Sequence, residues 1–252
     1  MLLTRTCRWP SSPVRADWAD AVAYAVAVTD RRTAAKRGSI NVETVITAAL
    51  ARVDAHGLDS LSMRELAADM GVGAMSLYRH VRDKEELLDL ITDRVIDGFV
   101  PERSAGDWPQ QAARICRKVR AGMLAHPELA TRALRRPVPA SATGLRVNGQ
   151  MVAMLIDGGL PRKAVPNVYW VLSTYAMGFS LFEIERRRAL GQRPRQGAGD
   201  RRRNLAALVV AFHVDVPETD ALAAVLSVDF GDRQFEYGLA AVISGLQATI
   251  RT

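Results

Sequence analysis

The residues best suited to chemistry in this chain lie on a short segment that could read a nucleic acid. Over residues 74–84, small, aromatic and cationic side chains surround two apolar positions, Leu77 and Val81, which are spaced to face a core. Side chains of these types contact base edges and phosphates in the grooves of DNA. The segment therefore favours DNA binding, although a helical hairpin can also be a purely structural unit.

The sequence shows no pattern typical of an enzyme. Its four histidines are too scattered for the spacing of a metal site: His56, His80, His126 and His213. Glu183 and Glu185 precede three arginines, so we interpret them as solvated surface charges and not as an acid/base pair. No glycine-rich loop has a phosphate-binding pattern. The sequence therefore predicts no catalytic residues, no metal and no cofactor.

Composition and charge are compatible with a helical protein that binds nucleic acid. The chain has 252 residues, of which 48% are hydrophobic and 6% aromatic, and its formal net charge is +7. Basic proteins of other classes share such a charge. The only cysteines, Cys7 and Cys116, indicate no disulfide framework, so a cytoplasmic location is predicted. No apolar run approaches the roughly 20 residues of a membrane helix.

Helices on both sides must hold the candidate DNA-reading segment. A helix is predicted over residues 41–56, where Asn41 can act as cap. Two short helices around a tight turn follow, and Ser62 with Glu65 has the spacing of a capping box for the first of them. Gly71 supplies the left-handed conformation that ends it. The Asp-Lys-Glu-Glu sequence that comes next is a second capping box, which opens a linking helix up to about Phe99.

The remainder of the chain is predicted to be a helical bundle. Its longest helix, over residues 161–190, carries two apolar stripes, which is typical of a helix buried between its own core and a partner. The other helices are predicted over 109–126, 141–158, 203–213, 219–227 and 232–250. Helices near 165–190 and 232–250 are candidates for a four-helix dimer interface, although their stripes could simply be intramolecular core.

Residues 1–38 are predicted to be a flexible N-terminal extension. Their outline is that of a signal peptide, but Asp17 and Asp20 interrupt it and the cleavage site is poor. The basic end of the extension consists of Arg31, Arg32, Lys36 and Arg37. It can lie along DNA phosphates or be a solvated tail.

Residues 71–88 strongly resemble the signature of TetR-type bacterial transcriptional regulators. The shared core is Leu-Tyr-x-His-Val followed by Lys-x-x-Leu-Leu, formed here by Leu77, Tyr78, His80, Val81, Lys84, Leu87 and Leu88. The resemblance covers about residues 40–98. The opening of the last helix more weakly resembles tetracycline-repressor-like regulatory domains. This resemblance implies an all-α fold, with a three-helix helix-turn-helix head over 39–98 and a helical effector-binding and dimerisation domain over 101–252.

The resemblance also assigns DNA contacts to individual residues. The second hairpin helix should enter the major groove, and a residue of the preceding helix should read a base. Eight residues match DNA-contacting positions of the family: Arg64, Ala74, Met75, Ser76, Tyr78, Arg79, His80 and Lys84. Because Ala74 and Met75 are apolar, contact with thymine methyl groups replaces hydrogen-bond readout there.

The regulatory domain implied by the resemblance should enclose a small effector. Six large residues are candidates for its lining, although each could equally be ordinary core: Trp108, Met123, Met151, Trp170, Tyr175 and Phe179. Ile115 and Val119 stand where tetracycline repressors place an amide and an aromatic contact, and no histidine matches their magnesium ligand. A mostly apolar organic effector is therefore expected in place of a metal–tetracycline complex.

These features together predict a homodimeric, ligand-responsive regulator. The favoured form is a repressor that a small organic effector releases from a palindromic double-stranded DNA operator, because one head buries too little DNA for specificity. The alternative is a helical small-molecule-binding or adaptor protein that keeps the hairpin as a scaffold. Such a protein would not need Tyr78, Arg79, His80 and Lys84 exposed together.

Overall fold

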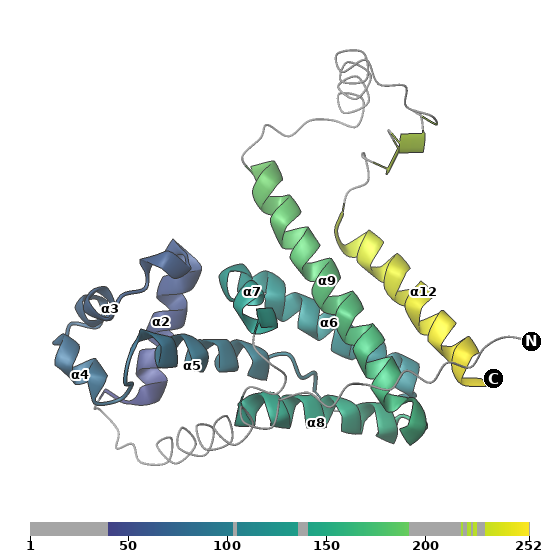
Figure 1. Ribbon diagram of the computed structural model, residues 1–252, viewed down its shortest axis with the longest axis horizontal. Coiled ribbons are helices and arrows are strands. Elements are labelled where there is room, and N and C mark those ends of the chain that lie inside the picture. Colours follow the sequence, from purple (N-terminus) through teal and green to yellow (C-terminus); the bar gives the residue numbers. More distant parts are fainter. Residues whose placement is uncertain are drawn as a thin grey trace, which may run out of the picture. The chain divides into compact units, whose positions relative to one another are not determined.

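The computed structural model is all-helical over the residues that it describes, as the sequence predicted (Figure 1). These residues are 40–102, 105–135, 141–191, 218, 221–222, 224–225 and 230–251. The predicted extension over 1–38 and helix over 203–213 lie outside them, as does most of the predicted helix over 219–227. No described helix has a stretch long and apolar enough to cross a membrane.

Contacts divide the chain into two compact units. The first consists of residues 1–98 and 132–150, and the second of residues 99–131 and 151–252. The sequence placed residues 132–150 in the second domain, whereas their contacts group them with the first unit. Two helices, α7 (Pro127–Arg135) and α8 (Ala142–Asp157), therefore have residues in both units.

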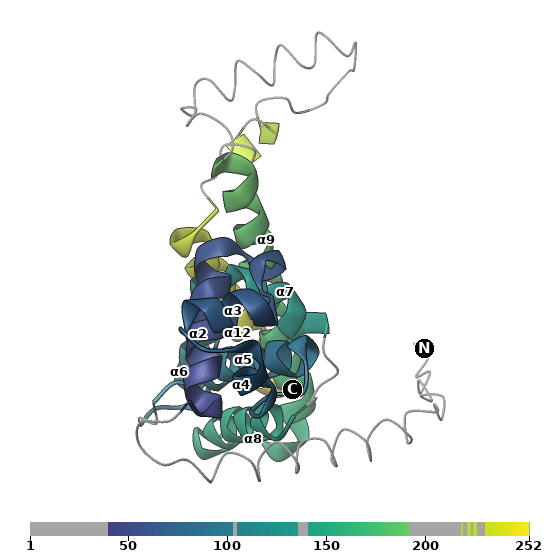
Figure 2. The same ribbon diagram turned by 90° about the vertical axis from the view of Figure 1, so that its left-hand side faces the viewer.

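The first unit contains the predicted three-helix head and the helix that follows it. Helix α2 (Val42–His56) packs on α5 (Lys84–Asp97), while α3 (Met63–Asp69) and α4 (Ala74–Tyr78) form the hairpin (Figure 2). A 3-10 turn over Leu58–Ser60 joins α2 to the hairpin. The core of the unit is aliphatic, and its fully buried side chains include Val45, Ile46, Val53, Leu66, Leu77, Leu87 and Ile91.

The caps that the sequence predicted for these helices are confirmed. Asn41 caps α2 in a reciprocal capping box with Thr44. The Ser62 hydroxyl accepts a hydrogen bond from the Glu65 backbone N–H at 3.2 Å, and the Glu65 carboxylate accepts one from that hydroxyl at 2.9 Å. Asp83 caps α5. Such caps satisfy backbone groups that a helix end leaves unpaired, so short helices can begin at defined residues.

The second unit is built on three packed helices. These are α6 (Trp108–Ala125), α9 (Val165–Gly191) and α12 (Asp232–Arg251), and each of them contacts the other two (Figure 1). Asp107 caps α6, which the sequence predicted over 109–126, and a proline occupies its first turn. A 3-10 turn over Arg162–Ala164 leads into α9, which is the long helix that the apolar stripes predicted.

Candidate functional site

The turn between α3 and α4 depends on a glycine. Gly71 has a φ of +68°, a conformation that a side chain makes costly by roughly 1–2 kcal/mol. Two backbone hydrogen bonds close the turn, from Gly71 N–H to the Ala68 carbonyl at 3.0 Å and from Val72 N–H to the Ala67 carbonyl at 2.9 Å. Helix α4 then starts after Gly73. The turn therefore fixes the direction in which α4 leaves α3.

Helix α4 has one buried side and one exposed side. Leu77 is fully buried and Val81, just beyond the helix, is 1% exposed. On the opposite side, 78% of the surface of Met75 and 47% of that of Tyr78 are exposed. Exposed apolar side chains next to cations are typical of binding surfaces. Met75 and Tyr78 are therefore available for binding and are not part of the core.

The structure places all eight residues predicted to contact DNA outside the core. Arg64 and Arg79 are exposed, as are Met75 and Tyr78, whereas the other four are half-buried: Ala74, Ser76, His80 and Lys84. Ala74, Met75, Ser76 and Tyr78 lie on α4, and Arg79 and His80 lie in the turn after it. Lys84 is the first residue of α5, and Arg64 lies on α3. Arg79 donates a hydrogen bond to the Ser76 hydroxyl at 3.4 Å. Their contacts with DNA remain a prediction.

An arginine that the sequence analysis did not single out ties the hairpin to α2. Arg52, on α2, donates to the Ser60 carbonyl at 3.0 Å and forms ion pairs with Glu65 at 3.1 Å and Asp69 at 2.6 Å. The hydrogen bond to Asp69 raises the pKa of Arg52 above its ordinary value. Both carboxylates belong to α3, so one cation holds that helix and neutralises acids near the proposed DNA surface.

A buried carboxylate fixes the turn between α4 and α5. Glu86 is only 4% exposed, and its Oε2 accepts hydrogen bonds from the backbone N–H of Arg82 at 2.5 Å and from Arg82 Nε at 3.1 Å. The Glu86 backbone N–H in turn donates to Asp83 Oδ1 at 2.8 Å. These contacts hold the residues immediately before Lys84, which the family resemblance assigned to a DNA contact.

The six candidate effector residues fall into three groups in the second unit. Trp108, Met123 and Met151 are buried, Tyr175 and Phe179 are half-buried, and Trp170 lies on the outside of α9 with 57% exposed. Tyr175 and Phe179 come together in an aromatic cluster with Phe230 and Phe235, in which Phe179 and Phe230 are stacked at 4.3 Å. The Trp108 backbone N–H donates to the Gly158 carbonyl at 2.7 Å. The role of all six in effector binding remains a prediction.

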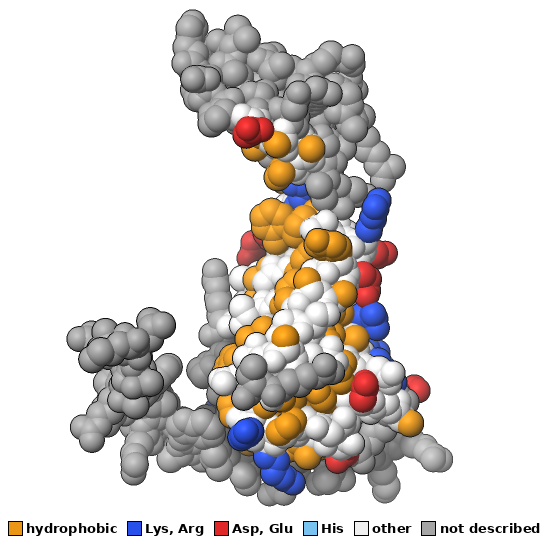
Figure 3. All heavy atoms as spheres, turned by 90° about the vertical axis from the view of Figure 1, so that its right-hand side faces the viewer, with side chains coloured by type: hydrophobic (Ala, Val, Ile, Leu, Met, Phe, Trp, Pro, Cys, Tyr) orange, Lys and Arg blue, Asp and Glu red, His pale blue; other side chains and the backbone are white. Residues whose placement is uncertain are grey.

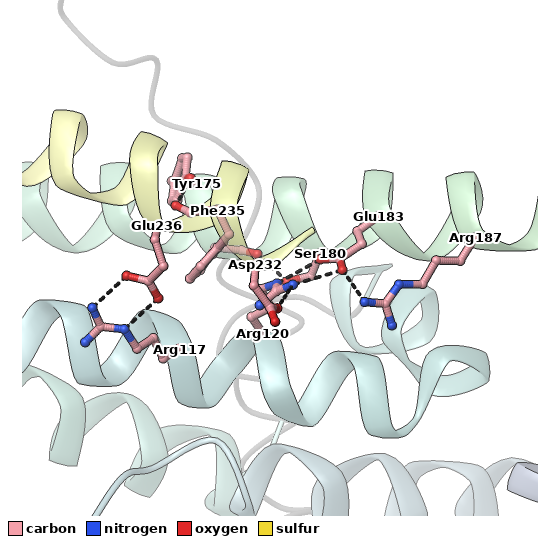
Figure 4. A network of polar contacts seen from close by, with 10 residues as sticks. Arg117, Arg120, Tyr175, Ser180, Glu183, Arg187, Asp232, Phe235 and Glu236 are labelled. Carbon is pink, nitrogen blue, oxygen red and sulfur yellow. Dashed lines mark hydrogen bonds and ion pairs between the residues drawn. The ribbon is translucent and has the colours of Figure 1, made fainter. Parts of the chain in front are cut away.

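A buried ion pair between α6 and α9 corrects our interpretation of Glu183. Its side chain is fully buried, and the Arg120 guanidinium donates two hydrogen bonds to its carboxylate (Figure 4). The distances are 2.8 Å from Nε to Oε2 and 2.9 Å from Nη2 to Oε1. Arg187 adds a third contact at 2.5 Å. The prediction of a solvated surface charge was therefore wrong. A sequence signal existed, because Glu183 lies on the same helical face as the buried Ala176 and Ser180.

Arg120 also connects this pair to α12. Its Nη2 forms an ion pair with Asp232 at 2.7 Å, and its guanidinium lies 4.8 Å from the centre of the Phe235 ring (Figure 4). One turn away, Arg117 forms two 2.7 Å hydrogen bonds with Glu236. The Arg117 guanidinium lowers the pKa of the Glu236 carboxyl. Charges on α6 therefore hold both α9 and α12.

Both parts of the chain match known protein families. Residues 45–91 match the model described as bacterial regulatory proteins of the tetR family, and residues 100–250 match the tetracyclin repressor-like C-terminal domain. The chain belongs to the TetR family. The family assignment confirms the resemblance in the sequence and places the chain among regulatory proteins, not enzymes.

Several members of the family are similar over long stretches. A transcriptional repressor of Mycobacterium tuberculosis is 30% identical over 154 residues, which are 59% of either chain, so the match spans about three fifths of that relative. The repressor DrrR1 of Streptomyces coeruleorubidus is 29% identical over 84% of this chain and 79% of its own length. Among solved structures, the TetR family protein ActR of Streptomyces coelicolor in complex with actinorhodin has a TM-score of 0.66. It is 33% identical and the match covers 84% of this chain and 97% of ActR.

Proposed function

We propose that this TetR-family chain is a homodimeric repressor that binds a palindromic DNA operator and is released by a small organic effector. The observation that carries the proposal is the exposed side of α4. It presents Met75 and Tyr78 to solvent beside Arg79, while Leu77 anchors the same helix in the core. An αα-hairpin that served only as a scaffold would gain nothing from this exposed surface.

Two helices of the second unit offer a surface for a second copy of the chain. On α9, Trp170, Val171 and Phe182 are exposed, and on α12 Tyr237 is 73% exposed. Apolar side chains run in a long band over this side of the molecule (Figure 3). The exposed residues of α12 between Tyr237 and Ile250 are small or short, namely Ala240, Ala241, Ser244, Gly245, Ala248 and Thr249. Small residues let a partner helix approach closely, and these helices from two copies would form a four-helix bundle.

The relatives support an organic effector for the second unit. ActR was solved in complex with actinorhodin, and its match extends over most of this chain. The buried candidates Trp108, Met123 and Met151 are apolar, which suits an uncharged or weakly polar molecule. A preference of about 5- to 150-fold for the DNA-free state would suffice for release.

The decisive experiment selects binders from a pool of random duplex DNA at two salt concentrations. We expect an enriched palindrome that the wild-type chain retains at the higher salt. The double variant Tyr78→Ala/Lys84→Ala should lose it. Lys163→Ala is the matched control, because it removes one exposed cation from the second unit and leaves the hairpin intact.

The opposite result favours the alternative function. Weak binding that enriches no sequence and disappears as salt rises would mean that the net charge of +7 attracts DNA nonspecifically. The chain would then be a helical small-molecule-binding or adaptor protein. Equal enrichment by the wild type and the double variant would remove α4 from the DNA interface.

A further inference from the structure

One face of α5 is a row of carboxylates. Glu85, Asp89, Asp93 and Asp97 follow one another at every fourth residue, so they lie along one side of the helix over roughly 18 Å. Like charges at this spacing repel one another. The last two also lie in the half of the helix where its dipole disfavours anions. This face is therefore unfavourable for an isolated helix and requires partners.

Each of the four carboxylates has a partner within residues 132–146, which belong to the same unit as α5. Arg132 forms ion pairs with Glu85 at 3.1 Å and Asp89 at 2.7 Å. The Ser141 hydroxyl donates to Asp93 at 2.8 Å, and Arg146 forms an ion pair with Asp97. The partners follow the carboxylates in the same order along the chain. We name these contacts of Arg132, Ser141 and Arg146 with α5 the carboxylate ladder.

Ser141 has two roles in the ladder. While its hydroxyl donates to Asp93, its oxygen accepts a hydrogen bond from the Gly144 backbone N–H at 3.0 Å and so caps α8. Both Ser141 and Asp93 are 7% exposed, so water does not replace this contact readily. The first residues of α8 are thus fixed to α5. The same helix continues without a break beyond Gln150 into residues of the second unit.

We propose that Arg132, Ser141 and Arg146 are positioning residues for DNA binding and its regulation. They hold α5 in the orientation that places Lys84 and the turn after α4, and they connect that orientation to α8. None of them belongs to the helix-turn-helix or to the predicted DNA contacts. The proposal rests on the proposed repressor function, to which it adds the residues that transmit the state of the second unit to the head.

The test uses the full-length protein and the DNA that the wild type selects. Arg146→Glu reverses one contact of the ladder, and Asp97→Arg/Arg146→Asp restores it with exchanged charges. The matched control is Arg94→Glu, which breaks the ion pair of α5 with Glu43. That pair is as exposed as Arg146 with Asp97, at 50% and 52% against 48% and 46%. Each single variant changes the net charge by the same amount, so nonspecific attraction to DNA changes equally.

We expect Arg146→Glu to weaken binding about 10-fold, within the usual range of coupling between sites. The exchanged pair should restore binding to within about 3-fold, and Arg94→Glu should stay within the same limit. Equal effects of Arg146→Glu and the control would overturn the proposal, because charge alone would then explain them. Failure of the exchanged pair to restore binding would overturn it as well.

A second readout requires no DNA. Amide hydrogen exchange of the free protein reports local opening. We expect Arg146→Glu to speed exchange in residues 79–88 as well as in 141–150, whereas Arg94→Glu should leave 141–150 unchanged. Unchanged exchange in residues 79–88 of Arg146→Glu would overturn the proposal. If the wild type selects no operator, the proposed function fails, and this readout still decides whether the ladder positions α5.

Discussion

The two units use charged residues in different ways. In the first unit, the ion pairs of Arg94 with Glu43 and of Arg146 with Asp97 are made at the surface, where each is worth about 0–1 kcal/mol. The carboxylate of Glu86 is buried there, but its partner Arg82 is 55% exposed. In the second, Arg120 meets a fully buried Glu183. Loss of one partner of such a pair costs far more than an exposed pair contributes, because a charge remains in the core. The buried pair, together with the contact of Arg120 with Asp232, connects three helices of the second unit.

The largest effect should come from breaking the buried pair. We expect Arg120→Met to destabilise the chain by about 3–5 kcal/mol, because Glu183 would remain buried without its fork of two hydrogen bonds. Chemical denaturation of the full-length protein measures this loss. The double variant Arg120→Met/Glu183→Met removes both charges and should recover most of the stability. A loss below about 1 kcal/mol for the single variant would contradict the prediction and mean that Arg187 or water compensates the Glu183 charge.

The next largest effect should come from Gly158, which packs closely against the backbone of Trp108 in the second unit. A Cβ added at Gly158 would lie 2.6 Å from the Trp108 nitrogen and 2.8 Å from its Cα. We therefore expect Gly158→Ala to destabilise the chain by about 1–3 kcal/mol, as overpacking does. Gly158 directly follows α8, whereas Gly149 lies within that helix, and a Cβ added at Gly149 would meet nothing within 4 Å. Gly149→Ala should be neutral or stabilising by up to about 1 kcal/mol, and thermal unfolding compares the two.

The sequence predicted what depends on neighbours along the chain. Helix caps at Asn41, Ser62 and Asp83 are local, since each bonds the backbone three residues later, and all were confirmed. The apolar periodicity likewise predicted the buried side of α4 and hence the exposure of Met75 and Tyr78. The exposed surface of the candidate DNA site was therefore accessible from sequence.

What the sequence did not predict depends on residues far apart. Glu183 and Arg120 are 63 positions apart, and Arg146 and Asp97 are 49 apart. The helical face of a charged residue can indicate burial, as it does for Glu183, but it does not identify a distant partner. The three arginines after Glu185 led to the surface assignment of Glu183, and neither its pair with Arg120 nor the carboxylate ladder was recognised. The repeat of acids at every fourth residue of α5 was its only local sign.

The smallest effect should come from the exposed ion pair of Arg117 with Glu236. It tests whether burial, and not membership of a unit, decides how much an ion pair contributes to stability. Arg117 and Glu236 belong to the second unit but are about half exposed, at 53% and 45%. We expect Arg117→Ala to cost less than about 1 kcal/mol, in spite of two 2.7 Å hydrogen bonds, and the cost to shrink in salt.

This exposed pair also predicts a dependence on pH. Arg117 lowers the pKa of Glu236 in the folded chain below its usual 4.5, so the unfolded chain binds the proton more readily. The stabilisation is therefore present above pH 4.5 and is lost as pH falls through the lower, folded pKa. Glu236→Gln should show a smaller loss of stability than the wild type over that acid range, and equal slopes would contradict the prediction. A cost at Arg117 as large as that at Arg120 would mean that membership of the second unit, and not burial, sets the strength of these pairs.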